Sequence, residues 1–132
     1  MQHIPPNQVA EHWDRVRVGL QRIIDKSPHV LAWAPGDVLC ALASGSAHLA
    51  LIDDDGFMIW QRLPGDDGRG MLFVWALEGK NLGQHLVPIE QALVVLAKHC
   101  NSKRIRIVGR RGWGRSKFWQ PAGYVYEHEV ML

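Results

Sequence analysis

The sequence has few of the features that define membrane, secreted or strongly charged proteins. Its longest apolar runs are interrupted by charge or glycine before the roughly 20 residues that a bilayer-spanning helix needs. Nothing resembles a secretory signal, and Cys40 and Cys100 each sit in an apolar helical pattern, so we expect reduced, packed thiols and a cytoplasmic setting. The formal net charge of +2 excludes nucleic-acid binding by bulk attraction alone.

Motifs for metal binding and nucleophilic catalysis are also missing. The seven histidines show no paired ligand spacing, and the acidic run at residues 53–56 lacks the ligand series of a calcium loop. No serine stands in a Gly-x-Ser-x-Gly setting. The sequence therefore predicts no metal site and no serine or cysteine nucleophile.

The chain does have enough apolar material for one ordinary core. With 132 residues and 47% hydrophobic content, it can bury roughly two-thirds of its unfolded surface. We expect a single domain over residues 1–132. Pro5 and Pro6 disfavour regular structure before them, so residues 1–8 are predicted to be a flexible arm, with Asn7 as the N-cap of a first helix.

Apolar periodicity predicts two helices and then a β-meander. The first helix is amphipathic, and a second runs over residues 38–44 and stops at Gly45, which adopts left-handed conformations without steric cost. Strands are expected at residues 47–53, 56–63 and 71–77, separated by Asp-Gly turns. Because the third strand is apolar on both faces, it should lie centrally with helices above and below.

The second half predicts one more helix and two strands. A helix should start near Pro88 and be closed by Asn101 and Ser102, because proline is favoured in a first helical turn. Residues 104–108 alternate as a strand, a glycine- and arginine-rich loop follows, and residues 124–131 form the last strand. The predicted class is α+β, a mixed, mostly antiparallel sheet with helices on both faces.

This order of elements resembles the fold of the Gcn5-related N-acetyltransferases (GNAT) over nearly the whole chain. The resemblance implies that acetyl-CoA, if the protein is an enzyme, places its diphosphate on the loop after the central strand, where Lys80, Asn81 and Gly83 stand. Only Gly83 matches the family's glycine pattern. Glu78 would set a carboxylate beside the phosphates, and it is also the candidate general base, with His48 and Asp53 as alternatives.

The family's general acid is commonly a tyrosine four residues before a Gly-Phe or Gly-Tyr pair. Gly123 and Tyr124 resemble that pair, but the position four residues earlier holds Trp119. An indole N–H is too weak an acid to replace a phenol. The resemblance therefore implies a GNAT scaffold without the family's usual proton donor.

The most distinctive local segment lies at residues 109–115. It resembles a Gly-Arg-Arg-Gly-Trp-x-Arg stretch of small GNAT-like proteins encoded by tailed phages and prophages, which implies a virion component or a role in virion assembly, in the host cytoplasm or the virion. The candidate partner-binding residues are Arg110, Arg111, Trp113 and Arg115. Arginine forks and a tryptophan face suit contacts with a protein or with nucleic acid.

The same segment belongs to a wider basic stretch that contains seven of the 15 cationic side chains. These are Lys103, Arg104, Arg106, Arg110, Arg111, Arg115 and Lys117. Three functions remain open. The first is a catalytically degenerate GNAT-like phage protein that contacts phage structural proteins, the second is an active acyl-CoA-dependent N-acetyltransferase, and the third is a nucleic-acid-binding module. Oligomer formation is compatible with each of them.

Overall fold

A mixed sheet forms the centre of the protein. The computed structural model describes residues 1–26, 33–64, 69–108, 120–122 and 125–131. In these residues the sheet has seven strands in the order β1-β2-β3-β4-β5-β7-β6, and only the β4/β5 pair is parallel. The strands are β1 (Gln2–Ile4), β2 (His48–Ile52), β3 (Gly56–Pro64), β4 (Gly70–Glu78), β5 (Ser102–Val108), β6 (Gln120–Ala122) and β7 (Val125–Glu129).

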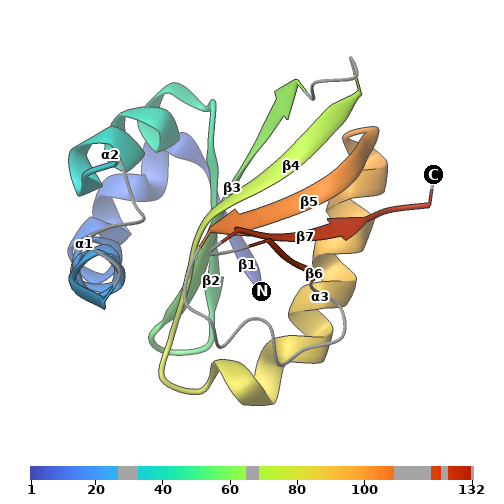
Figure 1. Cartoon of the computed structure of the whole chain (residues 1–132). Coiled ribbons are helices and arrows are strands. Elements are labelled where there is room, and N and C mark those ends of the chain that lie inside the picture. Colours follow the sequence, from blue (N-terminus) through green and yellow to red (C-terminus); the bar gives the residue numbers. More distant parts are fainter. Residues whose placement is uncertain (27–32, 65–68, 109–119, 123–124, 132) are drawn as a thin grey trace.

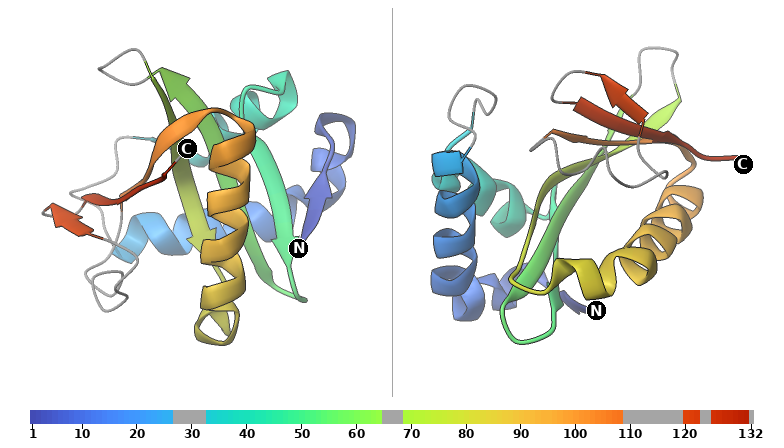
Figure 2. Two further views of the ribbon diagram at one scale, coloured as in Figure 1. Left: turned by 90° about the vertical axis from the view of Figure 1, so that its right-hand side faces the viewer. Right: turned by 60° about the horizontal axis from the view of Figure 1, so that its bottom comes forward.

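Helices cover both faces of this sheet. Helices α1 (Val9–Lys26) and α2 (Pro35–Ser44) lie on one face, and α3 (Leu82–His99) lies on the other (Figures 1 and 2). A short 3-10 helix, η1 (Pro6–Gln8), leads into α1. Of the helices in the described part of the chain, none has the length and hydropathy that a membrane crossing requires. The α+β class predicted from the sequence is confirmed.

Two apolar cores lie on opposite faces of the sheet. The core under α3 is built mainly from Met58, Trp60, Leu72, Val74, Leu77, Ile89, Leu93, Ala97, Ile105 and Ile107. The core under α1 and α2 contains Val16, Leu20, Val38, Leu42, Leu49, Phe57, Ile59 and Ala76. Strand β4 contributes to both cores, which confirms its predicted central position and explains why its sequence is apolar on both alternating faces.

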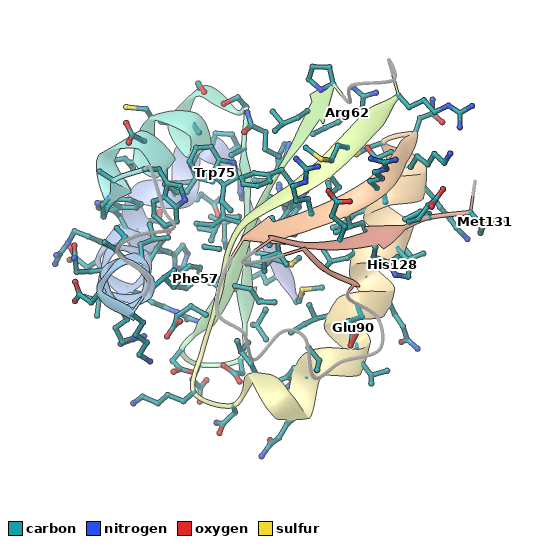
Figure 3. The ribbon with its side chains drawn as sticks, in the orientation of Figure 1. Phe57, Arg62, Trp75, Glu90, His128 and Met131 are labelled. Atoms are coloured by element: carbon teal, nitrogen blue, oxygen red, sulfur yellow. The ribbon has the colours of Figure 1, made fainter. Side chains whose placement is uncertain are left out.

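A β-bulge interrupts the alternation of β4. Ile59 and Trp60 of β3 pair with Ala76 and Val74, so Trp75 has no partner of its own on β3. As a result, Trp75 and Ala76 both contribute to the core under α1 and α2, whereas Val74 and Leu77 lie in the core under α3. Figure 3 shows Trp75 and Phe57 on the side of the sheet that carries α1 and α2.

The start of the chain differs from the prediction of a flexible arm over residues 1–8. Gln2–Ile4 form an edge strand that pairs with β2, and Ile4 is buried in the core under α1 and α2. Asn7 is not the N-cap, because it lies inside η1, whose N-cap is Pro5. One buried isoleucine and three ladder positions are enough to order this segment.

The predicted bounds of α3 are also wrong. The helix begins at Leu82, six residues before Pro88, and ends at His99, with Ser102 already in β5. Leu82 packs against the core under α3, so burial extends the helix on the N-terminal side of the proline. The short strand β6 was not predicted. Gly45, by contrast, is confirmed as the left-handed end of α2, with φ of 81°.

Close packing of α1 on the sheet depends on Gly19. A Cβ atom there would lie 2.3 Å from Cε1 of Phe57, whose ring is fully buried. We predict that Gly19→Ala destabilises the protein, because overpacking costs about 1–3 kcal/mol and outweighs the gain of about 1 kcal/mol in helix propensity.

The matched control is Gly36→Ala in α2, where nothing lies within 4 Å of the added Cβ. Urea unfolding should place Gly19→Ala at least about 1 kcal/mol below Gly36→Ala in free energy of unfolding. Equal stability of the two variants would contradict the tight α1 packing.

Candidate functional site

The loop between β4 and α3 is short and leads directly into the helix. Gly79, Lys80 and Asn81 connect the two elements, Asn81 is the N-cap, and its carbonyl accepts a bond from the Gln84 amide at 3.2 Å. Because α3 starts at Leu82, its free amides follow the loop at once, as an anion site requires. A Cβ on Gly83 would meet nothing within 4 Å.

The acidic β2–β3 turn reaches this loop. The Asp55 carboxylate accepts a hydrogen bond from the Lys80 amide at 3.2 Å, and an added Cβ on Gly79 would lie 3.0 Å from the Gly56 Cα. Asp53 Oδ2 lies 3.1 Å from His85 Nε2 in the first turns of α3. One loop amide and one helix side chain are thus already paired with carboxylates of the protein itself.

The charge of Asp53 is stabilised within the turn. Its Oδ1 accepts hydrogen bonds from the amides of Asp55 and Gly56, both at 3.1 Å. These bonds, followed by His85, hold the pKa of Asp53 below its ordinary value. Arg15 of α1 also donates to the Gly56 carbonyl at 2.6 Å, so the helix fixes the turn against the loop.

Glu78, the candidate general base, lies at the end of β4 on the face that carries α1. Its side chain is 7% exposed, and its Oε1 accepts a hydrogen bond from Arg22 Nε at 3.2 Å. The ion pair joins the first helix to the central strand. This contact holds the carboxylate on the α1 face of the sheet.

Strands β4 and β5 are paired over only part of their length. Their parallel register runs from Gly70↔Ser102 to Val74↔Ile107. Beyond Val74, at the bulge, no described strand pairs with this side of β4. The unpaired edge at residues 75–78 leads straight into the Lys80 loop, as Figure 1 lets the reader follow.

The predicted basic stretch is partly neutralised. Arg106 on β5 donates to Glu127 on β7, with Nε to Oε1 at 2.6 Å, and Lys103 Nζ lies 3.3 Å from Glu129 Oε1. Sequence reasoning missed these pairs because they depend on the register of β5 against β7. Fewer cations are therefore available for phosphates than the linear sequence suggests.

The remaining residues singled out in the sequence do not lie together in one described site. The proposed partner-binding residues Arg110, Arg111, Trp113 and Arg115, together with Lys117, Trp119 and the pair Gly123-Tyr124, lie outside the described residues. His48 and Asp53 stand at opposite ends of β2, so they do not form one catalytic group. Cys40 is exposed, which contradicts its predicted burial, and Cys100 is half-buried at the end of α3.

Comparison with known proteins supports the fold alone. No description of a protein family matches the sequence, and no curated protein matches it either. The structure is similar to a GNAT-family acetyltransferase from Listeria monocytogenes, with a TM-score of 0.57 and 12% identity over 96% of this chain and 92% of the other.

Two further solved structures are similar to this chain over most of its length. An integron cassette protein from the mobile metagenome of V. cholerae matches with a TM-score of 0.56 and 12% identity, over 92% of this chain and 91% of the other. A ribosomal-protein-alanine N-acetyltransferase from Brucella melitensis matches with a TM-score of 0.52 and 15% identity, over 92% and 95%. The chain therefore has the GNAT fold, as the resemblance implied.

The turn that faces the loop gives a pH-dependent stability prediction. A carboxyl whose pKa is lowered on folding adds stability above its unfolded value of about 3.8 and loses it as the pH falls through the folded value. Asp53→Asn should thus be less stable than the wild type near pH 6. The gap should close as the pH falls below 3.8 and through the lowered pKa of folded Asp53.

Urea unfolding at a series of pH values measures this gap. The exposed neighbour Asp54, mutated to Asn, controls for the loss of one negative charge from the same turn. A constant difference between wild type and Asp53→Asn across the acid range would contradict the assignment.

Proposed function

We propose that this chain is a GNAT-fold protein without acetyl-transfer activity that works by contacting another protein. The observation that carries the proposal is the hydrogen bond from the Lys80 amide to the Asp55 carboxylate. In this fold, that loop is where an acyl-CoA diphosphate would sit, and a carboxylate of the protein occupies it. An incoming diphosphate would have to displace Asp55 against the repulsion of the acidic turn.

The catalytic groups support the same conclusion. Glu78 is held by Arg22 on the face that carries α1, and the sequence has Trp119 where the family has its tyrosine acid. Neither residue offers the proton transfer that amine acetylation needs. The scaffold remains, while the residues that would perform the chemistry are either committed to structure or chemically unsuited.

The finer part of the proposal concerns the partner. We infer a phage structural protein, contacted through Arg110, Arg111, Trp113 and Arg115. The support is the resemblance of residues 109–115 to small GNAT-like proteins of tailed phages and the arginine and tryptophan content of the segment. The segment follows β5 directly in the sequence, and the ion pair between Arg106 and Glu127 joins β5 to β7 in the sheet.

An active acyltransferase is the second candidate, and two observations favour it. Helix α3 starts directly after the loop, contrary to the late start predicted at Pro88, and no strand in the described part of the chain pairs with the β5 side of β4 beyond Val74. Lys80 adds a positive charge to the loop. In this alternative, acetyl-CoA displaces Asp55 from the Lys80 amide and binds along that edge.

Calorimetric titration with acetyl-CoA separates the two candidates. We expect the wild type to bind no tighter than about 1 mM. Asp55→Asn should bind about five-fold tighter or more, because one unit charge a few ångströms from a phosphate is worth about 1 kcal/mol even in water. Asp54→Asn is the matched control, since it removes the same charge from a neighbouring residue of the turn whose side chain does not accept the bond from the Lys80 amide.

Micromolar binding by the wild type, together with acetylation of any amine, would overturn the proposal. Binding without turnover would instead identify an acyl-CoA-binding protein. These two readouts are measured separately, the first by heat and the second by release of free CoA thiol.

The phage role has its own test. If the chain is a structural component, mass spectrometry of particles purified from the source cells should detect it at a fixed ratio to the major structural proteins. A double variant Arg110→Ala/Arg111→Ala should lower that ratio, and its unfolding midpoint is compared with that of the wild type to separate loss of contact from loss of stability. An unchanged ratio would exclude the basic segment as the contact.

A further inference from the structure

A groove on the α3 face brings together residues that no sequence spacing relates. It has a volume of about 390 Å³ and runs between the edge of the sheet and α3, with His3, Ala50, Met58 and Trp60 on the strand side and Val95 and Leu96 on the helix side. His48 lies beside it, because its ring contacts those of His3 and Trp60. The acidic turn and the Lys80 loop are at the other end of β2.

Three rings form a nearly equilateral triangle at this groove. The centroid separations are 5.8 Å for His3 and His48, 5.6 Å for His48 and Trp60, and 6.0 Å for His3 and Trp60. The centre of this triangle is about 3.4 Å from each centroid. A metal ion about 2.0–2.1 Å from an imidazole nitrogen lies roughly 3.2 Å from the ring centroid, so the two distances agree.

The strand register places His3, Ala50 and Met58 in one row across three strands. His3 pairs with Ala50, and Ala50 pairs with Met58, so the small alanine separates a histidine from a methionine across three strands. His48 pairs with Trp60 one step along the same face. Since Ala50 fills little space, the longer side chains on either side can converge above it, and both His3 and Met58 line the groove.

We propose that this groove binds one soft monovalent metal ion, Cu(I) or Ag(I), between the imidazoles of His3 and His48. The thioether of Met58 is the third ligand, and the indole of Trp60 lies against the ion. Rotation of the imidazoles about χ2, which is a broad torsion, turns the ligand nitrogens toward the centre.

The chemistry of the groove selects this class of ion. Thioether sulfur prefers soft ions such as Cu(I), and an aromatic face attracts a cation. None of the described residues that line the groove carries a carboxylate, so a divalent ion would leave two charges uncompensated beside apolar groups.

The proposed metal site is separate from the proposed function. It also differs from the sequence analysis, which predicted no metal site. Among the described residues, no group of three or more histidines, cysteines, aspartates or glutamates could hold a metal ion. The groove reaches three ligands only because methionine joins the two histidines, which are 45 positions apart in the chain. A search for His and Cys spacing cannot find such a set.

The test is titration of the full chain with Ag(I), and with Cu(I) under anaerobic conditions against a chelator of known affinity. Cys40 and Cys100 would compete for both ions, so the experiment uses the Cys40→Ser/Cys100→Ser background, with its unfolding midpoint checked against the wild type. We expect one ion per chain and quenching of tryptophan fluorescence.

Substitutions assign the ligands. His48→Gln and Met58→Leu should each weaken binding at least about ten-fold, and His3→Gln, at an exposed edge position, provides the same test with little risk to the fold. Trp60→Phe should keep the stoichiometry and lose the quenching. The controls are the exposed residues His99 and Met131, whose replacement by Gln and Leu should leave the affinity unchanged.

Three results would overturn the proposal. The first is binding that the control substitutions weaken as much as the groove substitutions do. The second is Zn(II) binding as tight as that of Ag(I), which would exclude a site selective for soft monovalent ions. The third is no stoichiometric binding of either ion in a background that keeps the wild-type unfolding midpoint.

Discussion

Burial of β4 on both faces is the constraint on which the rest of the structure depends. A strand with apolar side chains above and below is stable only if helices cover both sides, and α3 and the α1–α2 pair supply that cover. The bulge at Trp75 then changes which residues face each core. Without it, Glu78 would lie on the α3 face and could not meet Arg22 of α1.

The same strand delivers the loop whose chemistry decides between the two functional candidates. At the end of β4, the β2–β3 turn is fixed by Arg15 and by the hydrogen bonds of Asp53 within the turn. These contacts hold the Asp55 carboxylate at the loop. Coulomb repulsion between one carboxylate and a diphosphate is modest in water. The Asp55 carboxylate opposes phosphate binding in a second way, because it also accepts the hydrogen bond of the Lys80 amide. A phosphate would need that amide as a donor.

The sequence was a good guide where local chemistry decides the structure. The Asp55-Gly56 turn, the glycine stop at residue 45 and the doubly apolar central strand all match the fold, because each depends on a few adjacent residues. It failed where distant contacts decide. Burial of Leu82 carries α3 past the start suggested by Pro88, and Ile4 orders β1. In the site, the Asp55–Lys80 contact and the Arg106–Glu127 pair need a strand register that periodicity does not provide.

The acidic turn and the histidine groove are independent features of one scaffold. His48 begins β2 and Asp53 follows its end, so about 17 Å of extended strand separates them. Energetic effects at sites so far apart are usually additive. The acidic turn lies at the end of β2 that is next to the Lys80 loop and the start of α3. The histidine groove lies at the opposite end of β2, beside the edge strand β1. A change at the Lys80 loop therefore places little constraint on what the histidine groove binds, and the two features can be tested separately.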